Sequence, residues 1–199
     1  MNLLVIRHGQ SEADILHVLE GRADFELTEL GQRQAAQMAA WVHERFTVDA
    51  IYASPLKRAS QTAQALSQAV NRPVIYDDNL MEFQNGLVAG LPRDVAAAQY
   101  PMPAVKHPHT AVYGQESALQ FRFRAEMALS KIIHENDADA TVAIVSHGGL
   151  IRMLFQSFLG LSAVSTVSIA SGDTGVHHWQ IDGERRIVVF ANSCNHISE

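Results

Sequence analysis

Apolar residues along this chain are arranged in two ways, in short runs and in longer stretches with helical spacing. The short runs predict strands at Asn2–Ile6, Asp49–Ala53, Pro73–Tyr76, Thr141–Val145, Val176–Ile181 and Arg186–Ala191. The longer stretches predict helices from a Thr28 cap to Phe46 and over Leu56–Val70, Glu116–His134 and Gly149–Leu159. Leu119, Phe123, Met127 and Ile132 are apolar residues of the third helix at about helical spacing.

This alternation of strands and helices favours a mostly parallel sheet with helices on both faces. Asp182-Gly183, between the last two strands, is a hairpin signal. We therefore predict an α/β fold, a three-layer α/β/α sandwich with a mostly parallel central sheet and a C-terminal antiparallel hairpin at or near one edge. With 199 residues the chain is long enough for one well-buried core and short for two. Residues 1–199 are expected to form a single domain.

Composition and charge narrow the range of partners. Hydrophobic residues make up 47% of the chain and charged residues 18%, as in an ordinary globular protein, and the net charge of -6 argues against nucleic acid or an acidic membrane surface as the main partner. Cys194 is the only cysteine, which excludes an internal disulfide and a thiolate metal cluster. We find no signal segment and no apolar run that could cross a bilayer. A cytoplasmic protein without a membrane partner is expected.

Two histidines directly follow apolar runs and are the strongest candidates for chemistry. Arg7-His8-Gly9-Gln10 follows the first predicted strand, and Ser146-His147-Gly148-Gly149 follows the strand at Thr141–Val145. Ligands of open α/β sheets bind outside the carboxyl ends of the strands, so both segments could line one polar pocket suited to phosphate. The competing interpretation is that each histidine is an ordinary loop or core residue and that the glycines only provide turns.

The remaining histidines give little support for a metal site. His177-His178 lies in a strand, where neighbouring side chains point to opposite faces. The pair is therefore a poor candidate for metal binding. No metal and no other cofactor is predicted.

Four separated motifs of the chain occur together in one known family. They are Arg7-His8-Gly9, Ser54-Pro55-Leu56-Lys57-Arg58-Ala59 with Thr62-Ala63, Glu82 with Gly86 and Gly90-Leu91 downstream, and Ser146-His147-Gly148-Gly149. In their order and spacing they resemble the histidine phosphatase superfamily, also called phosphoglycerate mutase-like. The resemblance runs from the first strand to past residue 150.

The resemblance implies a metal-independent reaction on a small phosphorylated substrate. His8 would attack phosphorus in line and form a phosphohistidine, which water then hydrolyses. To attack, His8 must be neutral, so its other ring nitrogen is expected to bond a backbone carbonyl of the glycine loop. Arg7, Arg58 and His147 would surround the phosphoryl oxygens. Glu82 would protonate the leaving alkoxide and later activate water.

Other residues are weaker candidates for the same pocket. Gln10 could touch the substrate, Ser11 could donate to phosphate, and Gly148 could offer a free backbone N–H at the start of a helix. On position alone, Arg58 would be a solvated helix charge and Glu82 a solvated carboxylate. The family match reverses both of these assignments.

Two positions depart from the family pattern by adding negative charge. The chain has Asp14 where the family commonly has Asn, and Glu20 where many members carry Gln. If these side chains reach the pocket they should weaken phosphate binding, because desolvated like charges repel. Alternatively the loop is displaced and both are solvated. Arg22 and Arg93 could face the pocket entrance, but the pattern favours surface charges.

Among reactions, phosphomonoester hydrolysis is favoured over two alternatives. A cofactor-dependent phosphoglycerate mutase would need a larger lid and more positive charge than this chain offers, and the predicted lid, around residues 87–113, is compact. A non-catalytic binding member of the family would have lost a core residue, and none is lost. Activity is expected to favour mildly acidic to neutral pH. The terminal hairpin could also pair across a homodimer.

Overall fold

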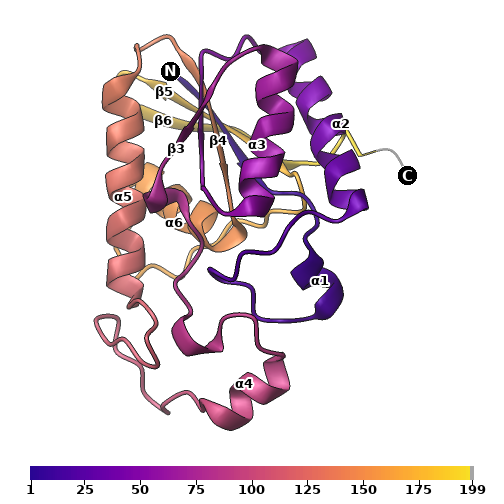
Figure 1. The fold of residues 1–199 in the computed structure, drawn as a ribbon. Coiled ribbons are helices and arrows are strands. Elements are labelled where there is room, and N and C mark those ends of the chain that lie inside the picture. The colour runs from indigo at the N-terminus through magenta and orange to yellow at the C-terminus, as the bar shows by residue number, and fades with distance from the viewer. Residues whose placement is uncertain (198–199) are drawn as a thin grey trace.

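The computed structural model of the protein describes residues 1–197, and in it a central sheet lies between two layers of helices (Figure 1). The strands are β1 (Asn2–Arg7), β2 (Ala50–Ala53), β3 (Val74–Tyr76), β4 (Thr141–Ser146), β5 (Val176–Asp182) and β6 (Arg185–Ser193). The helices are α1 (Glu12–Leu16), α2 (Glu29–Arg45), α3 (Lys57–Val70), α4 (Arg93–Gln99), α5 (Ala118–Glu135) and α6 (Gly148–Phe158), with the 3-10 turns η1 (Asp78–Leu80) and η2 (Gly86–Val88).

The strand order across the sheet is β3-β2-β4-β1-β5-β6. The pairs β3–β2, β2–β4 and β4–β1 are parallel, and β5 and β6 complete the sheet as an antiparallel hairpin. The predicted fold class and the terminal hairpin are therefore confirmed. Because β2, β4 and β1 are adjacent and parallel, their carboxyl ends lie at one edge of the sheet.

Apolar side chains from β1 and β4 fill both faces of the sheet. Leu3 and Val5 belong to the cluster under α5 and α6, whereas Leu4 and Ile6 belong to the cluster under α2 and α3. Burial on both faces explains why the central strands are unbroken apolar runs. This double burial holds the sheet edge, and the side chains that leave it, in fixed positions.

Three of the four apolar residues named above for helix α5 lie outside its buried face. Leu119, Phe123 and Met127 are exposed by 39%, 67% and 51%. Ile132, the fourth, is buried, together with Phe121, Ala125, Ala128 and Leu129. Small alanines let α5 approach the core closely, and large side chains at those positions would hold it away.

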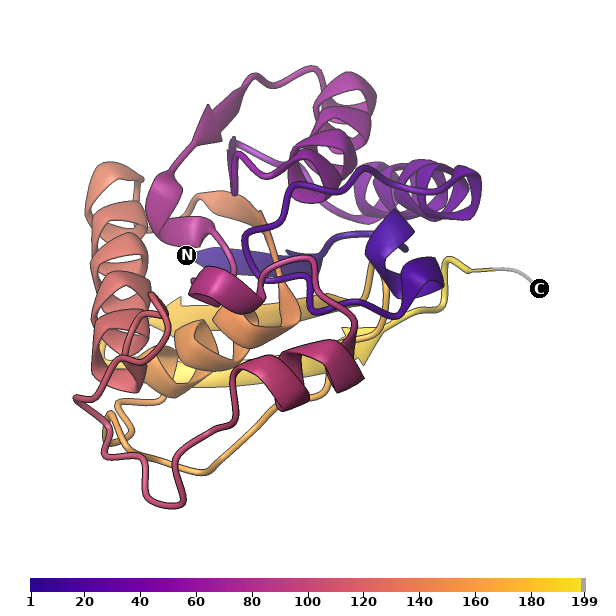
Figure 2. The same cartoon turned by 60° about the horizontal axis from the view of Figure 1, so that its bottom comes forward.

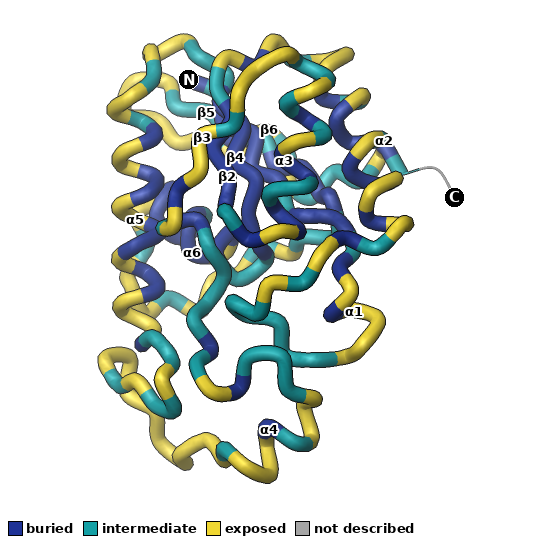
Figure 3. Tube along the Cα trace, viewed as in Figure 1, coloured by how far each residue is buried: buried dark blue, intermediate teal, exposed yellow. Residues whose placement is uncertain are grey.

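The segment from residue 86 to residue 113 lies in front of the carboxyl edge of the sheet and is largely exposed (Figures 2 and 3). Backbone hydrogen bonds of Gly90 N–H to Leu19 O, 2.7 Å, and of Leu19 N–H to Leu91 O, 2.9 Å, attach it to the loop after α1. Among residues 1–197, no helix has the length and apolar character needed to cross a membrane.

Candidate active site

His8 lies immediately after β1 and is almost fully buried, with 2% of its surface exposed. Its Nδ1 is 2.8 Å from Gly9 O, the kind of backbone carbonyl expected from the sequence. Nδ1 therefore carries the ring proton, and Nε2 keeps a lone pair. Burial first, and then the charges of Arg58 and Arg7, lower the pKa of His8 well below its usual range. At neutral pH this imidazole is an uncharged base.

Arg58, in the first turn of α3, is fully buried beside that lone pair. Its Nε donates to His8 Nε2 at 3.3 Å, while Nη1 and Nη2 donate to the carbonyls of Ala23 and Gly21 at 3.0 and 2.8 Å. Two of its three nitrogens are thus bound to the loop after α1. Nε is the nitrogen that faces the imidazole.

Thr62 belongs to the motif that contains Arg58, although the sequence suggested no contact for it. In the structure it joins α3 to the loop that carries His8. Its hydroxyl accepts from Gly9 N at 3.2 Å and donates to Arg58 O at 2.7 Å. The hydroxyl thereby fixes the distance between the arginine and the imidazole.

His147 lies at the end of β4, with its ring centroid 5.0 Å from that of His8. Its Nε2 is 2.8 Å from Ser54 Oγ, and Ser54 Oγ also accepts from Leu56 N–H. Ser54 can therefore give its own proton to Nε2, which leaves the ring proton of His147 on Nδ1. This Nδ1 is buried without a partner in the described part of the chain, so it can donate to an oxygen of a ligand.

Arg7, the last residue of β1, is held by the loop before β5. Its Nη1 donates to Ser171 O at 2.7 Å, and its Nη2 is 3.3 Å from Asp173 Oδ1. Its buried Nε has no partner among residues 1–197. A Cβ atom on Gly148 would lie 4.0 Å from Arg7 Nε, so the start of α6 is next to this side chain. Ser171 and Asp173 carry no sequence signal for this role.

Glu82 follows η1, and its carboxylate accepts two backbone hydrogen bonds. Gly149 N donates to Oε2 at 2.8 Å and Phe83 N donates to Oε1 at 2.7 Å. A Cβ atom on Gly149 would lie 2.3 Å from Oε1, so only glycine leaves room for the carboxylate there. Nothing in the sequence indicated that Gly149 bonds Glu82, and the predicted contact of Gly148 with a ligand stays a prediction.

The loop that carries Glu82 is fixed by Arg124, a buried residue of α5. Arg124 donates to the carbonyls of Asn79, Met81 and Glu82, and it pairs with both oxygens of Glu116 at 2.7 and 2.9 Å. Arg22 Nε also lies 3.3 Å from Glu82 O, so Arg22 reaches this loop, whereas Arg93 is exposed at the start of α4.

Two of the weaker candidates do not meet the histidines. Gln10 Oε1 accepts from Thr28 Oγ1 at 2.8 Å, which turns the Gln10 side chain toward the start of α2. Asp14 is exposed and forms a capping box with Ser11 at the start of α1. The expectation that a displaced loop leaves both acidic substitutions solvated therefore describes Asp14 only.

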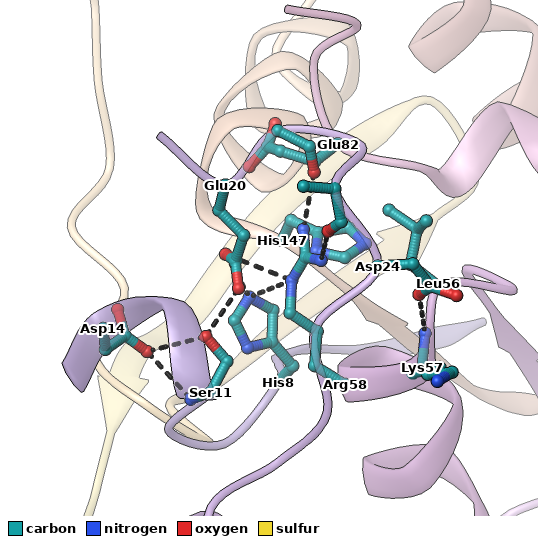
Figure 4. Close-up of polar contacts among 12 residues, drawn as sticks. His8, Ser11, Asp14, Glu20, Asp24, Leu56, Lys57, Arg58, Glu82 and His147 are labelled. Atoms are coloured by element: carbon teal, nitrogen blue, oxygen red, sulfur yellow. Dashed lines mark hydrogen bonds and ion pairs between the residues drawn. The ribbon is translucent and has the colours of Figure 1, made fainter. Parts of the chain in front are cut away.

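Glu20 does reach the pocket, as Figure 4 shows. Its Oε2 is 3.1 Å from Arg58 Nε and 3.8 Å from His8 Nε2. Its Oε1 is 2.5 Å from the hydroxyl of Ser11, which is buried. Burial raises the pKa of Glu20, against the opposing effect of Arg58.

A cavity of about 640 Å³ opens beside Glu82 and Gly149. Its apolar wall includes Phe83, Phe121 and Met153, and its cations are Lys106 and Arg152. Lys106 belongs to the predicted lid segment. Arg152 has no side-chain partner in the described part of the chain.

Comparisons with known proteins identify the family and several relatives of this chain. Residues 3–193 match the histidine phosphatase superfamily (branch 1). Phosphoserine phosphatase 1 of Hydrogenobacter thermophilus is 25% identical over 100% of this chain and 95% of its own. Glucosyl-3-phosphoglycerate phosphatase of Mycolicibacterium vanbaalenii is 30% identical over 80% of this chain and 74% of its own.

Solved structures of related proteins share the fold of this chain. YhfR of Bacillus stearothermophilus superposes with a TM-score of 0.86, at 25% identity over 99% of both chains. A mycobacterial glucosyl-3-phosphoglycerate phosphatase in complex with VO3 superposes with a TM-score of 0.84, at 27% identity over 96% of this chain and 98% of the other.

The α/β fold and these relatives define an enzyme of the phosphomonoesterase class. The chain belongs to the histidine phosphatase superfamily.

Proposed function

We propose that this protein hydrolyses a small phosphorylated metabolite through a phosphohistidine formed on His8. The observation that carries the proposal is the 2.8 Å contact between His8 Nδ1 and Gly9 O. It places the proton on Nδ1, and burial with two nearby cations keeps the ring neutral. A neutral Nε2 with a free electron pair is the form of histidine that attacks phosphorus.

In the first step, the Nε2 electron pair forms a bond to phosphorus while the bond from phosphorus to the ester oxygen breaks. Glu82 gives its proton to the departing oxygen. Arg58 Nε, Arg7 Nε and His147 Nδ1 are donors without a carbonyl partner, and they stabilise the charge on the three phosphoryl oxygens.

In the second step, water forms the new bond to phosphorus and the nitrogen–phosphorus bond breaks, which returns the electron pair to His8. Glu82 takes the proton from the attacking water and is then ready for another cycle. The backbone donors Gly149 and Phe83 hold the carboxylate in place for both transfers.

The cavity beside Glu82 would receive the leaving group, because the proton donor lies on its wall. Its apolar wall suits a carbon skeleton, and Arg152 and Lys106 suit an anionic substituent on that skeleton. The names of the relatives point the same way, since phosphoserine and glucosyl-3-phosphoglycerate both carry a carboxylate.

The test is a phosphomonoester panel assayed with and without chelator, together with acid-quench trapping of the phosphoenzyme. We expect chelator-insensitive hydrolysis that His8→Ala abolishes and that the exposed-residue control His43→Ala retains. Hydrolysis that survives in His8→Ala would overturn the proposal. The runner-up is a phosphoglycerate mutase, which would interconvert 3- and 2-phosphoglycerate and show little net release of phosphate.

A further inference from the structure

A chain of three polar residues leads from the surface of α1 to the nucleophile (Figure 4). Asp14 Oδ2 lies 3.1 Å from Ser11 Oγ, and Ser11 Oγ lies 2.5 Å from Glu20 Oε1. The other oxygen of Glu20 is 3.1 Å from Arg58 Nε and 3.8 Å from His8 Nε2. The two acidic departures from the family pattern are thus linked through one hydroxyl.

The inner oxygen of Glu20, Oε2, lies beside Arg58 and His8, where the proposed reaction needs a phosphoryl oxygen. Nη1 and Nη2 of Arg58 point to the carbonyls of Ala23 and Gly21, and Nε, which carries a single N–H, is the nitrogen that faces His8. Glu20 Oε2 lies against this same Nε. An ionised Glu20 would therefore compete with a phosphoryl group for one N–H, and two desolvated anions would repel each other.

The contacts of the Ser11 hydroxyl show where a proton on Glu20 would be bound. Ser11 has a single O–H but lies within hydrogen-bond distance of a carboxyl oxygen on each side. One hydroxyl proton can serve only one of them. While Glu20 is ionised, one of these two contacts has no proton; once Glu20 is protonated, it can donate to Ser11 while Ser11 donates to Asp14. Burial also raises the pKa of Glu20.

We propose that Glu20 is a phosphoryl-binding residue whose carboxylate pairs with Arg58 in the free enzyme and becomes protonated when a dianion binds. Each dianion then brings one proton into the site, and the affinity for dianions falls as pH rises. This inference rests on the proposed function, because it assumes that the phosphoryl group lies between His8 and Arg58.

Other charged groups around Glu20 do not produce this pH dependence. His8 and His147 have pKa values well below their usual range, so they stay neutral in the mildly acidic to neutral range. Arg58 stays charged throughout. The remaining acidic groups that influence Glu20 or its partner Arg58 are Asp14 on α1, Asp24 in the loop before α2 and Glu82 after η1.

The test measures binding of tungstate, which remains a dianion from about pH 5.5 to about pH 8, by titration calorimetry in two buffers of different ionisation enthalpy. The wild-type enzyme should take up about one proton per tungstate at neutral pH and lose up to about tenfold in affinity per pH unit. Glu20→Gln should take up about none, bind more tightly at the alkaline end and show a flat profile. Glu12→Gln, the same change at an exposed position of α1, should behave as wild type.

Equal proton uptake and equal pH slopes in wild type and Glu20→Gln would overturn the inference. Weaker binding by Glu20→Gln at alkaline pH would do the same. Either result would leave the proposed function intact if His8→Ala still abolishes hydrolysis. If His8→Ala keeps its activity, the proposed function itself is wrong.

Discussion

At the scale of single residues, the site depends on contacts that join neighbouring strand ends. The sequence pattern favoured His8 and His147, because motif and strand exit coincide at these positions, whereas Arg58 was predicted only from the family motif. It could not identify the role of Ser54, because the contact of Ser54 with His147 requires that β2 lie next to β4. A signal was present all the same, since Ser54 also directly follows a strand.

Substitution of Gly149 should impair proton donation by Glu82 and leave the other proposed steps largely unchanged. In Gly149→Ala the new methyl group would meet Glu82 Oε1 at 2.3 Å and displace it. We expect kcat/KM for an alkyl phosphate such as phosphoserine to fall by about 10²–10⁴-fold, the usual contribution of a general acid. An aryl phosphate, whose leaving group needs less protonation, should lose much less.

Gly148→Ala is the matched control, because a methyl group there meets Arg7 only at an ordinary 4.0 Å. Its loss with phosphoserine should be much smaller than that of Gly149→Ala. Equal losses with the alkyl and the aryl substrate in Gly149→Ala would show that Glu82 is not the proton donor.

At the scale of elements, helical periodicity located α5 but did not determine its buried face. Leu119, Phe123 and Met127 recur at helical spacing just as core residues do, yet they are exposed. The buried face holds Phe121, Leu129 and Ile132 beside two alanines. Large apolar residues therefore lie on more than one side of α5, and their spacing alone does not select the buried side.

Arg124 connects α5 to the Glu82 loop, and its loss should destabilise the fold. Arg124→Ala would leave Glu116 half-buried without its partner and would remove the donors to three loop carbonyls. We expect the free energy of unfolding to fall by about 3–5 kcal/mol, as for other broken buried ion pairs. Urea denaturation measures this change.

For comparison, Arg45→Ala removes an exposed pair with Glu44 and should change the free energy of unfolding by under about 1 kcal/mol. Similar urea midpoints for the Arg45 and Arg124 variants would contradict the assigned role of Arg124.

His177 on β5 should make the fold sensitive to acid. Burial lowers its pKa from 6.5 to about 4. The unfolded chain therefore binds more protons between these values, so the contribution of His177 to stability is complete above about pH 6.5 and is lost as pH falls toward about pH 4. The loss is at most about 3 kcal/mol.

Thermal unfolding across this pH range tests the point. His177→Gln should have a shallower fall in melting temperature with acid than wild type, and His134→Gln, at an exposed position, should keep the wild-type slope. A wild-type slope in His177→Gln would assign the acid sensitivity to other groups.

At the scale of the whole molecule, the sheet could be predicted from the sequence because its central strands are buried on both faces. The selectivity of the enzyme for its substrate could not be predicted. The cavity beside Glu82 combines residues from α5, α6 and residues 106–108, which no local pattern connects. The edge strand β6 exposes Val188 and Val189, and its pairing in a homodimer stays a prediction that sedimentation analysis can check.

Arg152 should select substrates that carry a carboxylate. Arg152→Ala should lower kcat/KM for phosphoserine by roughly tenfold, the effect of losing one charge-assisted hydrogen bond, and leave phenyl phosphate nearly unchanged. Kinetics on the two substrates measure the ratio. Equal losses on both would indicate that Arg152 acts on folding or on the phosphoryl group instead.

The meeting of three parallel strand ends also determines when catalysis can begin in a newly made chain. β1 and β4 pair through Asn2 with Thr141 and through Arg7 with Ser146, partners far apart in sequence. Pairings of such high contact order form late, after local helices. A ribosome-bound chain that has not yet released β4 has no second histidine beside the first, so turnover should begin only after β4 has left the ribosome.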